Sequence, residues 1–83
     1  MNSWLVYLVK CRDGTKYCGA TNNIEKRLRA HNTGKGAKYT KTRRPVLLLL
    51  TSRLMSKSAA LKLEHKVKKQ KANKKVDYLE MFS

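Results

Sequence analysis

The sequence of 83 residues is poor in acidic side chains. Five aspartates and glutamates stand against twenty lysines and arginines, which gives a formal net charge of +15 at pH 7. A charge of this size opposes compaction by self-repulsion, and its usual purpose is to bind a polyanion, most often a nucleic acid. No segment shows the broad Trp/Phe/Leu face of a membrane-surface helix. We therefore expect DNA as the partner, RNA less so, and no membrane.

The sequence also lacks long apolar runs, a secretion signal and closely spaced cysteines. Its longest purely apolar stretch is residues 46–50, far short of the roughly 20 residues that a membrane-spanning helix needs. No charged region followed by an apolar run opens the chain, so we expect a cytoplasmic protein. In that reducing compartment Cys11 and Cys18 are expected to be free thiols, and their spacing to the histidines does not fit zinc.

The pattern of apolar residues predicts one domain, residues 1–83, of the α/β class (an α+β sandwich). Residues 4–11 are β-branched and aromatic on both faces, which predicts a well-covered strand. The dipeptide Asp13-Gly14 is a strong hairpin signal, so residues 16–21 should form a second, antiparallel strand. The continuously apolar residues 46–53 predict a third, buried strand. With three helices, the expected order is ββαβαα: a three-stranded antiparallel sheet flanked by helices.

Capping residues mark the ends of the expected helices. Asn22 can cap the first helix, Glu25 is placed to complete a capping box, and Gly34 suits the left-handed position just after its end. Ser56 or Ser58 can cap the second helix, which runs to about residue 70, and a short last helix is expected over residues 74–81.

A polar, basic loop is expected over residues 33–44, closed by a proline. Its cations suit contacts with a phosphate backbone, and Tyr39 suits stacking on a base. The loop lacks the glycine and lysine spacing of a nucleotide-binding loop. Seven of the fourteen residues 62–75 are lysines and only one, Glu64, is acidic, which favours a second backbone contact. The expected nucleic-acid-binding residues are Lys35, Lys38, Tyr39, Lys41, Arg43, Arg44, Lys62, Lys66 and Lys69.

Three charged or titratable residues fall on helix faces that should be apolar. At about 100° per residue, Arg27 and His31 share the apolar face of the first helix, one turn apart. Either side chain could instead extend around the rim of the core. Glu64 falls inside the apolar arc of the second helix, where a carboxylate is costly without a partner. It could form a buried ion pair with Arg27 or a lysine, or bind a metal ion.

The two strands carry Tyr7 and Tyr17, whose relative placement depends on the hairpin register. A two-residue turn would pair Arg12 with Thr15 and put the tyrosines on opposite faces of the sheet. A three-residue turn with a bulge would pair Arg12 with Lys16 and put them on the same face. The residues alone leave both registers open, and either tyrosine could be an ordinary amphipathic side chain of a sheet.

Taken in order, these residues resemble the GIY-YIG nuclease superfamily, above all its small bacterial stand-alone members, which are similar to the UvrC and intron-endonuclease (URI) catalytic domain. The resemblance covers about residues 4–80. It rests on Val-Tyr-Leu at 6–8, Tyr-Cys-Gly at 17–19, Thr21-Asn22, Arg27-Leu28, His31, the segments 32–40 and 43–45, and Glu64. The first motif departs from Gly-Ile-Tyr, and Ala20 stands where repair relatives carry a lysine.

The resemblance implies hydrolysis of DNA phosphodiester bonds with one divalent ion, Mg²⁺ or Mn²⁺. Glu64 would bind the ion, and Arg27 would bind the scissile phosphate. Tyr7 and Tyr17 would line the site on a shared face, which favours the bulged hairpin, and one of them would act as general base. A phenol with a pKa near 10 is a poor base, but a metal ion and a positive field would lower that pKa. His31 would lie near the nucleophile and could relay the proton.

The expected function is therefore that of a metal-dependent DNA endonuclease in DNA repair or processing. The alternative is a non-catalytic nucleic-acid-binding module on the same fold. The protein is expected to act as a monomer. Because larger relatives carry a separate DNA-recognition domain that this chain lacks, a protein partner could supply target recognition.

Overall fold

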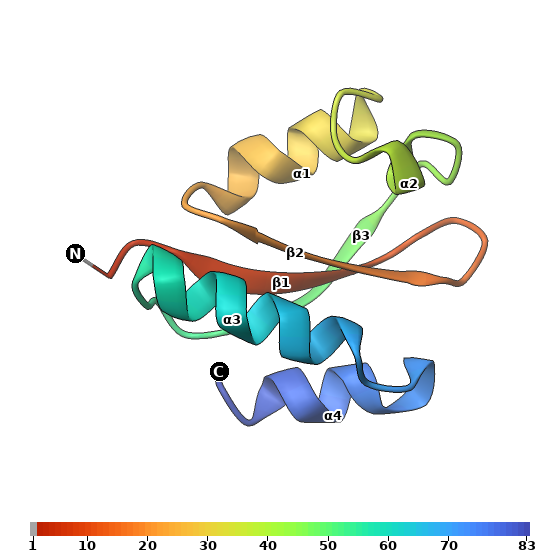
Figure 1. Cartoon of the computed structure of the whole chain (residues 1–83). Coiled ribbons are helices and arrows are strands. Elements are labelled where there is room, and N and C mark those ends of the chain that lie inside the picture. The colour runs from red at the N-terminus through yellow and green to blue at the C-terminus, as the bar shows by residue number, and fades with distance from the viewer. Residues whose placement is uncertain (1) are drawn as a thin grey trace.

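The computed structural model describes residues 2–83, in which helices pack on both faces of a three-stranded antiparallel sheet (Figure 1). The strands are β1 (Leu5–Lys10), β2 (Lys16–Thr21) and β3 (Leu47–Thr51), in the spatial order β2-β1-β3. The helices are α1 (Ile24–Asn32), α2 (Lys38–Lys41), α3 (Lys57–Lys68), the 3₁₀ helix η1 (Ala72–Lys74) and α4 (Lys75–Glu80). The predicted fold class is confirmed, and α2 is added to the predicted order.

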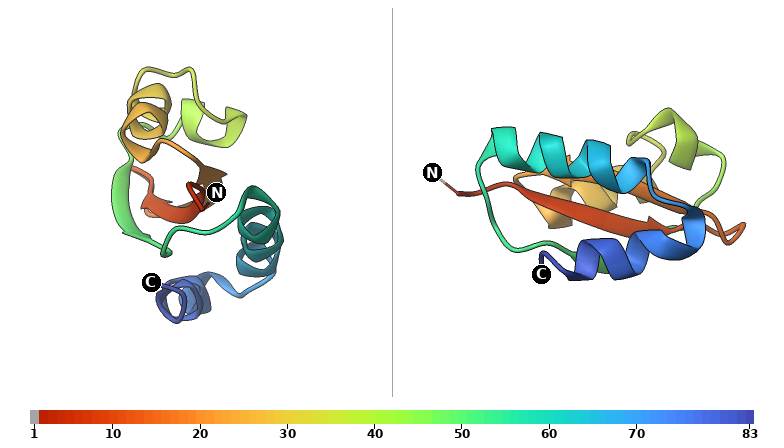
Figure 2. Two further views of the ribbon diagram at one scale, coloured as in Figure 1. Left: turned by 90° about the vertical axis from the view of Figure 1, so that its left-hand side faces the viewer. Right: turned by 60° about the horizontal axis from the view of Figure 1, so that its bottom comes forward.

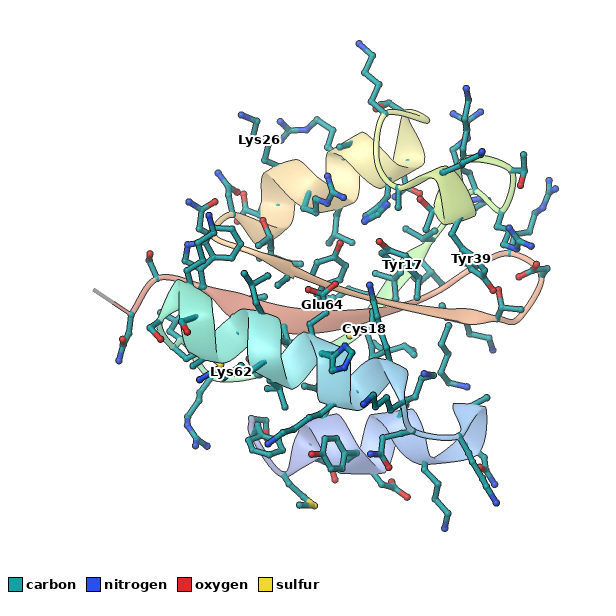
Figure 3. All side chains as sticks on the ribbon, in the orientation of Figure 1. Tyr17, Cys18, Lys26, Tyr39, Lys62 and Glu64 are labelled. Atoms are coloured by element: carbon teal, nitrogen blue, oxygen red, sulfur yellow. The ribbon has the colours of Figure 1, made fainter. Side chains whose placement is uncertain are left out.

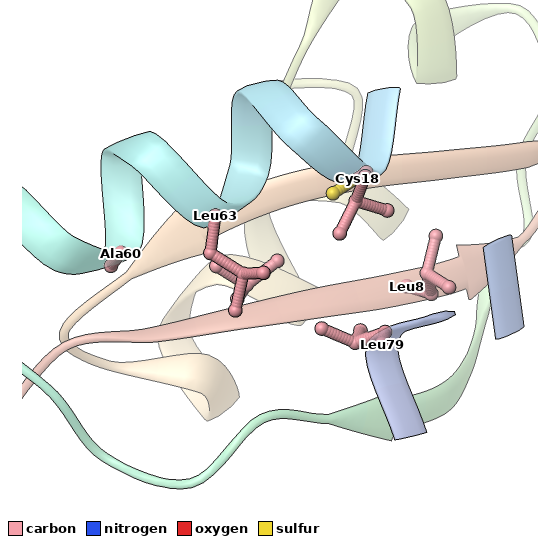
Figure 4. Packing of buried hydrophobic residues seen from close by; sticks show 7 residues of the cluster. Leu8, Cys18, Ala60, Leu63 and Leu79 are labelled. Atoms are coloured by element: carbon pink, nitrogen blue, oxygen red, sulfur yellow. The ribbon is translucent and has the colours of Figure 1, made fainter. Parts of the chain in front are cut away.

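The central strand β1 is covered on both faces, as its sequence predicts. Residues 6–9 are fully buried. Figure 2 shows α1 and α2 on one side of the sheet and α3 with α4 on the other. The cluster on the α3 and α4 side is shown in Figure 4 and comprises Val6, Leu8, Cys18, Ala60, Leu63, Val67 and Leu79. The cluster on the α1 side comprises Tyr7, Val9, Cys11 and Val46, with Leu5, Tyr17, Ile24 and Leu28 packed against it.

The β1–β2 hairpin closes with a three-residue loop that begins at Arg12. The backbone N–H of Cys11 donates to the carbonyl of Thr15 (2.8 Å), and the N–H of Gly14 donates back to the carbonyl of Cys11 (2.9 Å). Gly14 has a φ of +87°, a left-handed conformation that glycine adopts without steric cost. The bulged type of turn is therefore present, one residue earlier in the chain than expected.

The position of this loop sets the register of the two tyrosines. Tyr7 lies opposite Gly19, and Tyr17 lies opposite Val9, so both tyrosines point to the α1 side of the sheet. The expected shared face is confirmed. The expected pairing of Arg12 with Lys16 is wrong, because the register shifts by one residue in the opposite direction.

Helix α1 begins one residue later than predicted. Asn23, not Asn22, is the capping residue, and its side chain accepts a hydrogen bond from the N–H of Lys26 (3.1 Å). Glu25 is therefore the second helical residue rather than the third, so the predicted capping box does not form. The end of the helix is as predicted: Gly34 has a φ of +82°, and three N–H groups beyond the helix donate to carbonyls of its last turn.

The basic segment of residues 33–44 is more ordered than the predicted loop. It contains α2, whose Thr40 is fully buried in the protein. The Asn32 side chain ties the far end of the segment to α1, since it accepts a hydrogen bond from the N–H of Val46 (2.7 Å) and donates to the carbonyl of Val46 (3.3 Å). The segment therefore packs against α1 instead of extending into solvent.

Strand β3 is an edge strand, and this overturns its predicted burial. Leu47, Leu48 and Leu49 are 68%, 41% and 40% exposed, and the pairing with β1 shifts register beside Leu49. An uninterrupted apolar run suggested a strand covered on both faces, but the edge position leaves these leucines partly uncovered. The second long helix is capped by Ser56, the first of the two predicted caps. No helix within residues 2–83 has both the length and the apolar character to cross a membrane.

Candidate active site

Four of the predicted site residues come together on the α1 side of the sheet. Tyr7 comes from the central strand and Tyr17 from the neighbouring edge strand β2. Arg27 and His31 project from successive turns of α1. His31 is fully buried, so the alternative that it lies at the rim of the core is wrong, whereas Arg27 is half-buried.

Hydrogen bonds join Arg27, Tyr7 and His31 into one continuous network. The Nε of Arg27 donates to the hydroxyl oxygen of Tyr7 (3.3 Å), and this hydroxyl lies 2.8 Å from Nε2 of His31. The other ring nitrogen of His31, Nδ1, lies 2.7 Å from Oγ1 of Thr40. Within residues 2–83 no buried side-chain nitrogen or oxygen lacks a hydrogen-bond partner. Tyr7, Arg27 and His31 therefore form a single polar unit inside the core.

Gly19 makes room for this unit. A Cβ atom at position 19 would collide with the hydroxyl and the ring of Tyr7, which lies across the strand pair from it. The glycine of the Tyr-Cys-Gly segment is thus required by the close approach of the Tyr7 phenol to the backbone of β2.

We expect Gly19→Ala to lower the free energy of unfolding by about 1–3 kcal/mol, the usual cost of overpacking a core. The new methyl group must displace the Tyr7 hydroxyl from His31. Urea unfolding of the variant measures the loss. In a Tyr7→Phe background the same substitution should cost less, because the hydroxyl, the nearest colliding atom, is gone and only the clash with the ring remains. An equal cost in both backgrounds would contradict the assignment of the clash to the hydroxyl.

Aromatic contacts extend the site from His31 towards the hairpin loop. The ring of Tyr17 meets His31 edge-on, with centroids 5.4 Å apart, and stacks on Tyr39 at 5.8 Å. The Arg43 guanidinium lies 4.0 Å from the centroid of the Tyr39 ring. Tyr39 is 38% exposed, so a base that stacks on it would join or replace these neighbours.

Arg43 already has protein partners. Its Nε donates to the Asp13 carboxylate (3.0 Å), and its NH1 nitrogen donates to the carbonyl of Tyr39 (2.8 Å). Arg44 donates from Nε to the carbonyl of Lys41 (3.0 Å). These two arginines hold the basic segment in place, and only their remaining N–H groups are available to a phosphate.

Glu64 lies on the side of α3 that faces Tyr17, and its side chain is 19% exposed (Figure 3). Its Oε2 accepts from the ammonium of Lys68 (2.8 Å), which also lies 5.6 Å from the centroid of the Tyr17 ring. The ion pair that the sequence left open is therefore formed with a lysine and not with Arg27. Lys68 connects α3 to the tyrosines past the edge of β2.

The donor set around Glu64 fits only one kind of metal site. Within residues 2–83 no three His, Cys, Asp or Glu side chains gather into a ligand cage. A single carboxylate suits Mg²⁺ or Mn²⁺ that keeps most of its water and completes its shell with substrate phosphate oxygens. Such an ion would have to replace the Lys68 ammonium at Glu64.

The predicted nucleic-acid-binding residues fall into two separate groups. The group on the segment around α2 adjoins the tyrosines through Tyr39 and comprises Lys35, Lys38, Tyr39, Lys41, Arg43 and Arg44. The other group lies on α3. Lys62 and Lys66 are two positions from Glu64, so the helix places them on its far side, where they line a shallow depression with Arg53. Lys69 lines a different depression between α3 and α4. The structure does not bring this second group to the tyrosines.

Burial and charge shift two pKa values in the polar unit. Burial raises the pKa of the Tyr7 phenol, and the hydrogen bond and charge of Arg27 offset only part of this rise. The positive charge of Arg27 does lower this pKa, as expected, but burial outweighs it in the protein without a metal ion. Burial lowers the pKa of His31, and the nearby charge of Arg27 lowers it further. At neutral pH Tyr7 is a phenol and His31 a neutral imidazole.

Sequence reasoning did not single out Thr40 or Lys68. Thr40 belongs to the segment 32–40 on which the resemblance rests, but the sequence does not show its contact with His31, which depends on how the segment 33–44 folds back on α1. Lys68 does carry a signal, since it follows Glu64 by four residues, the spacing of a helical ion pair.

Known proteins show the same combination of sequence and fold. The UPF0213 protein of Staphylococcus haemolyticus is 48% identical over 75 residues, which cover 90% of this chain and 92% of that protein. The UPF0213 protein of Nitratidesulfovibrio vulgaris is 45% identical over 88% of this chain and 66% of its own length. The NMR structure of a protein from E. faecalis has a TM-score of 0.65 at 40% identity, covering 99% of this chain and 88% of that one.

The NMR structure of the UPF0213 protein from Bacillus halodurans has a TM-score of 0.57 at 38% identity, over 98% of this chain and 85% of that one. The family model of the GIY-YIG catalytic domain matches residues 3–77. This range contains both tyrosines, the two polar residues of α1 and the carboxylate of α3. The chain therefore belongs to the GIY-YIG nuclease family, in a branch of small bacterial proteins.

Proposed function

We propose that this protein is a metal-dependent endonuclease that hydrolyses phosphodiester bonds of DNA, in DNA repair or processing. The observation that carries the proposal is the buried unit of Arg27, Tyr7 and His31. Burying polar groups costs free energy even when they are paired, and apolar side chains would fill the same space at lower cost. A phenol that contacts both an imidazole and a guanidinium is instead an arrangement for moving a proton beside a phosphate.

Tyr7 is the general base in this proposal. Because Tyr7 is fully buried in the free protein, substrate binding must first open a path for the attacking water to its oxygen. That oxygen then takes a proton from the water as its own proton passes to Nε2 of His31. The water oxygen bonds to phosphorus, the bond to the leaving ester oxygen breaks, and that oxygen takes a proton from solvent. Because burial raises the pKa of Tyr7, the resting site holds no phenolate, and the transfer to His31 must accompany the attack.

Arg27 binds the scissile phosphate. Its Nε is held by Tyr7, and the side chain also lines an open depression with Thr21, Asn22, Asn23, Lys26 and Ala30. Its other guanidinium N–H groups can therefore donate to two phosphate oxygens. An open site of this kind suits a polymer that passes over the surface.

Glu64 would hold Mg²⁺ or Mn²⁺, which would supply positive charge to the phosphate. With an ion at Glu64 the Lys68 ammonium would be free to leave the carboxylate, and its half-exposed side chain could turn towards the substrate. Lys68 would then supply a cation near Tyr17, where this chain has Ala20 in place of the lysine of repair relatives.

A cleavage assay tests the proposal. We expect the purified protein to nick supercoiled plasmid or to cut branched DNA with Mg²⁺ or Mn²⁺ present. EDTA should stop the reaction, and excess metal should restore it. Binding that weakens with salt, with no cleavage of either DNA under any metal condition, would contradict the proposal.

A non-catalytic nucleic-acid-binding module is the second candidate, and the Lys68–Glu64 ion pair favours it. In this reading Glu64 only orders Lys68, and the net charge of +15 does all the binding. DNA affinity would then depend on lysines and salt, with no effect of divalent metal beyond ionic strength.

A further inference from the structure

The buried polar unit continues beyond His31 to Thr40, on the helix α2. Thr40 and His31 are both fully buried, with Oγ1 of Thr40 2.7 Å from Nδ1 of the imidazole. The same hydroxyl lies 3.0 Å from the carbonyl oxygen of Ala37. The backbone of Gly36 packs against the other side of this contact, since a Cβ there would collide with His31. The segment 36–40 therefore closes over one edge of the imidazole.

The positions of the hydrogens in this series of hydrogen bonds follow from Arg27, the donor at the end opposite Thr40. The guanidinium of Arg27 can only donate, so the Tyr7 oxygen accepts from it. The Tyr7 hydroxyl hydrogen must then go to its other neighbour, Nε2 of His31. A neutral imidazole that accepts at Nε2 carries its hydrogen on Nδ1.

Thr40 is the acceptor that this hydrogen requires. Nδ1–H donates to Oγ1 of Thr40, whose own hydrogen is directed to the carbonyl of Ala37. The N–H of Ala37 also donates towards Nδ1, at the long distance of 3.5 Å. With the hydrogen on Nε2 instead, Nδ1 could accept from Ala37 and Thr40, but the Tyr7 hydroxyl, which already accepts from Arg27, would have no acceptor for its own hydrogen.

We infer that Thr40 is a positioning residue of the candidate active site: its hydroxyl oxygen holds the proton of His31 on Nδ1 and so keeps Nε2 ready to take the proton of Tyr7. The inference rests on the proposed function for its catalytic consequence. The proton placement itself is a property of the free protein.

Replacing Thr40 by valine tests the inference, because valine keeps the shape and removes the oxygen. Nδ1–H would then lack an acceptor, and the N–H of Ala37 would be the remaining partner of Nδ1. We expect the proton to move to Nε2. In a protein labelled with ¹⁵N in its histidines, long-range ¹H–¹⁵N correlation spectra should show His31 as Nδ1–H in the wild type and in Thr40→Ser, and as Nε2–H in Thr40→Val.

Cleavage should follow the tautomer. We expect kcat to fall about 100-fold in Thr40→Val, within the usual contribution of a positioned acid or base, and by less than about threefold in Thr40→Ser. A wild-type His31 with its proton on Nε2 would overturn the inference, even if Thr40→Val does not fold. An unchanged tautomer in folded Thr40→Val, or a serine variant as impaired as the valine variant, would also overturn it.

The spectra need no DNA and no metal ion, so they separate the two claims. If no substrate is cut but the tautomers change as expected, the proposed nuclease activity fails while the positioning by Thr40 stands. If DNA is cut and the tautomers do not change, the inference fails and the proposed function stands.

Discussion

Replacing Tyr7 by phenylalanine is expected to reduce the rate of DNA cleavage by about a thousandfold, because the substitution removes the group that accepts the proton of the attacking water. It also leaves Arg27 Nε without its acceptor and His31 Nε2 without its donor inside the core. The free energy of unfolding should therefore fall by about 1–3 kcal/mol. Single-turnover cleavage of a labelled DNA and urea unfolding measure the two effects.

Two other tyrosines provide matched controls. Tyr78 lies on α4, on the opposite side of the sheet, where it packs with Phe82, and Tyr78→Phe should leave cleavage unchanged. Tyr17→Phe removes a hydroxyl beside the site but keeps the ring that contacts His31 and Tyr39, so we expect a smaller loss than at Tyr7. Full loss in Tyr17→Phe with cleavage retained in Tyr7→Phe would show that Tyr17 is the base.

The periodicity of the helices and strands predicted most of the residues that meet in the site. The spacing of Arg27 and His31 placed them together on the buried face of α1, and the structure joins both to Tyr7. The placement of Tyr7 and Tyr17 on one face of the sheet was harder to predict, because it depends on where the hairpin loop begins. Asp13-Gly14 marks the turn in the sequence, but only the backbone hydrogen bonds show that the loop starts at Arg12.

Features that depend on distant parts of the chain could not be predicted. An apolar run does not tell whether its strand is central or at an edge, and the leucines of β3 are exposed for that reason. The burial of Thr40 has no sequence signal, because it follows from the packing of residues 33–44 against α1. The sequence left open whether Glu64 pairs with Arg27 or with a lysine. The answer depends on the side of β2 on which α3 packs, and in the structure the partner is Lys68.

These non-local contacts change how the site is understood. Lys68 pairs with the Glu64 carboxylate, so the protein without a metal ion already holds a cation at the position proposed for the metal. Tyr39 and Arg43 join the hairpin loop to Tyr17, so DNA that bound on the basic segment would lie close to the hydrogen-bonded unit of Arg27, Tyr7 and His31. Binding and chemistry would then be coupled through the segment that also carries Thr40.

Replacing Glu64 by glutamine should reduce metal-dependent cleavage by about a thousandfold or more while DNA binding persists. The amide keeps the shape of the side chain but removes the charge that holds a divalent ion. Stability should change little, because the ion pair with Lys68 is a helical pair worth about 0.3–0.5 kcal/mol. Binding in EDTA should be equal or slightly tighter, because the variant carries one more net positive charge. Cleavage kinetics and fluorescence anisotropy with labelled DNA measure the two outcomes.

Glu80→Gln is the matched control, because it makes the same chemical change at an exposed position on α4. Both variants have the same net charge, so any gain in DNA affinity from charge alone should be equal in the two. If the carboxylate is needed specifically at position 64, Glu64→Gln should stop cleavage and Glu80→Gln should not. Equal cleavage by both would remove Glu64 from the metal site, and an equal loss in both would assign the effect to net charge.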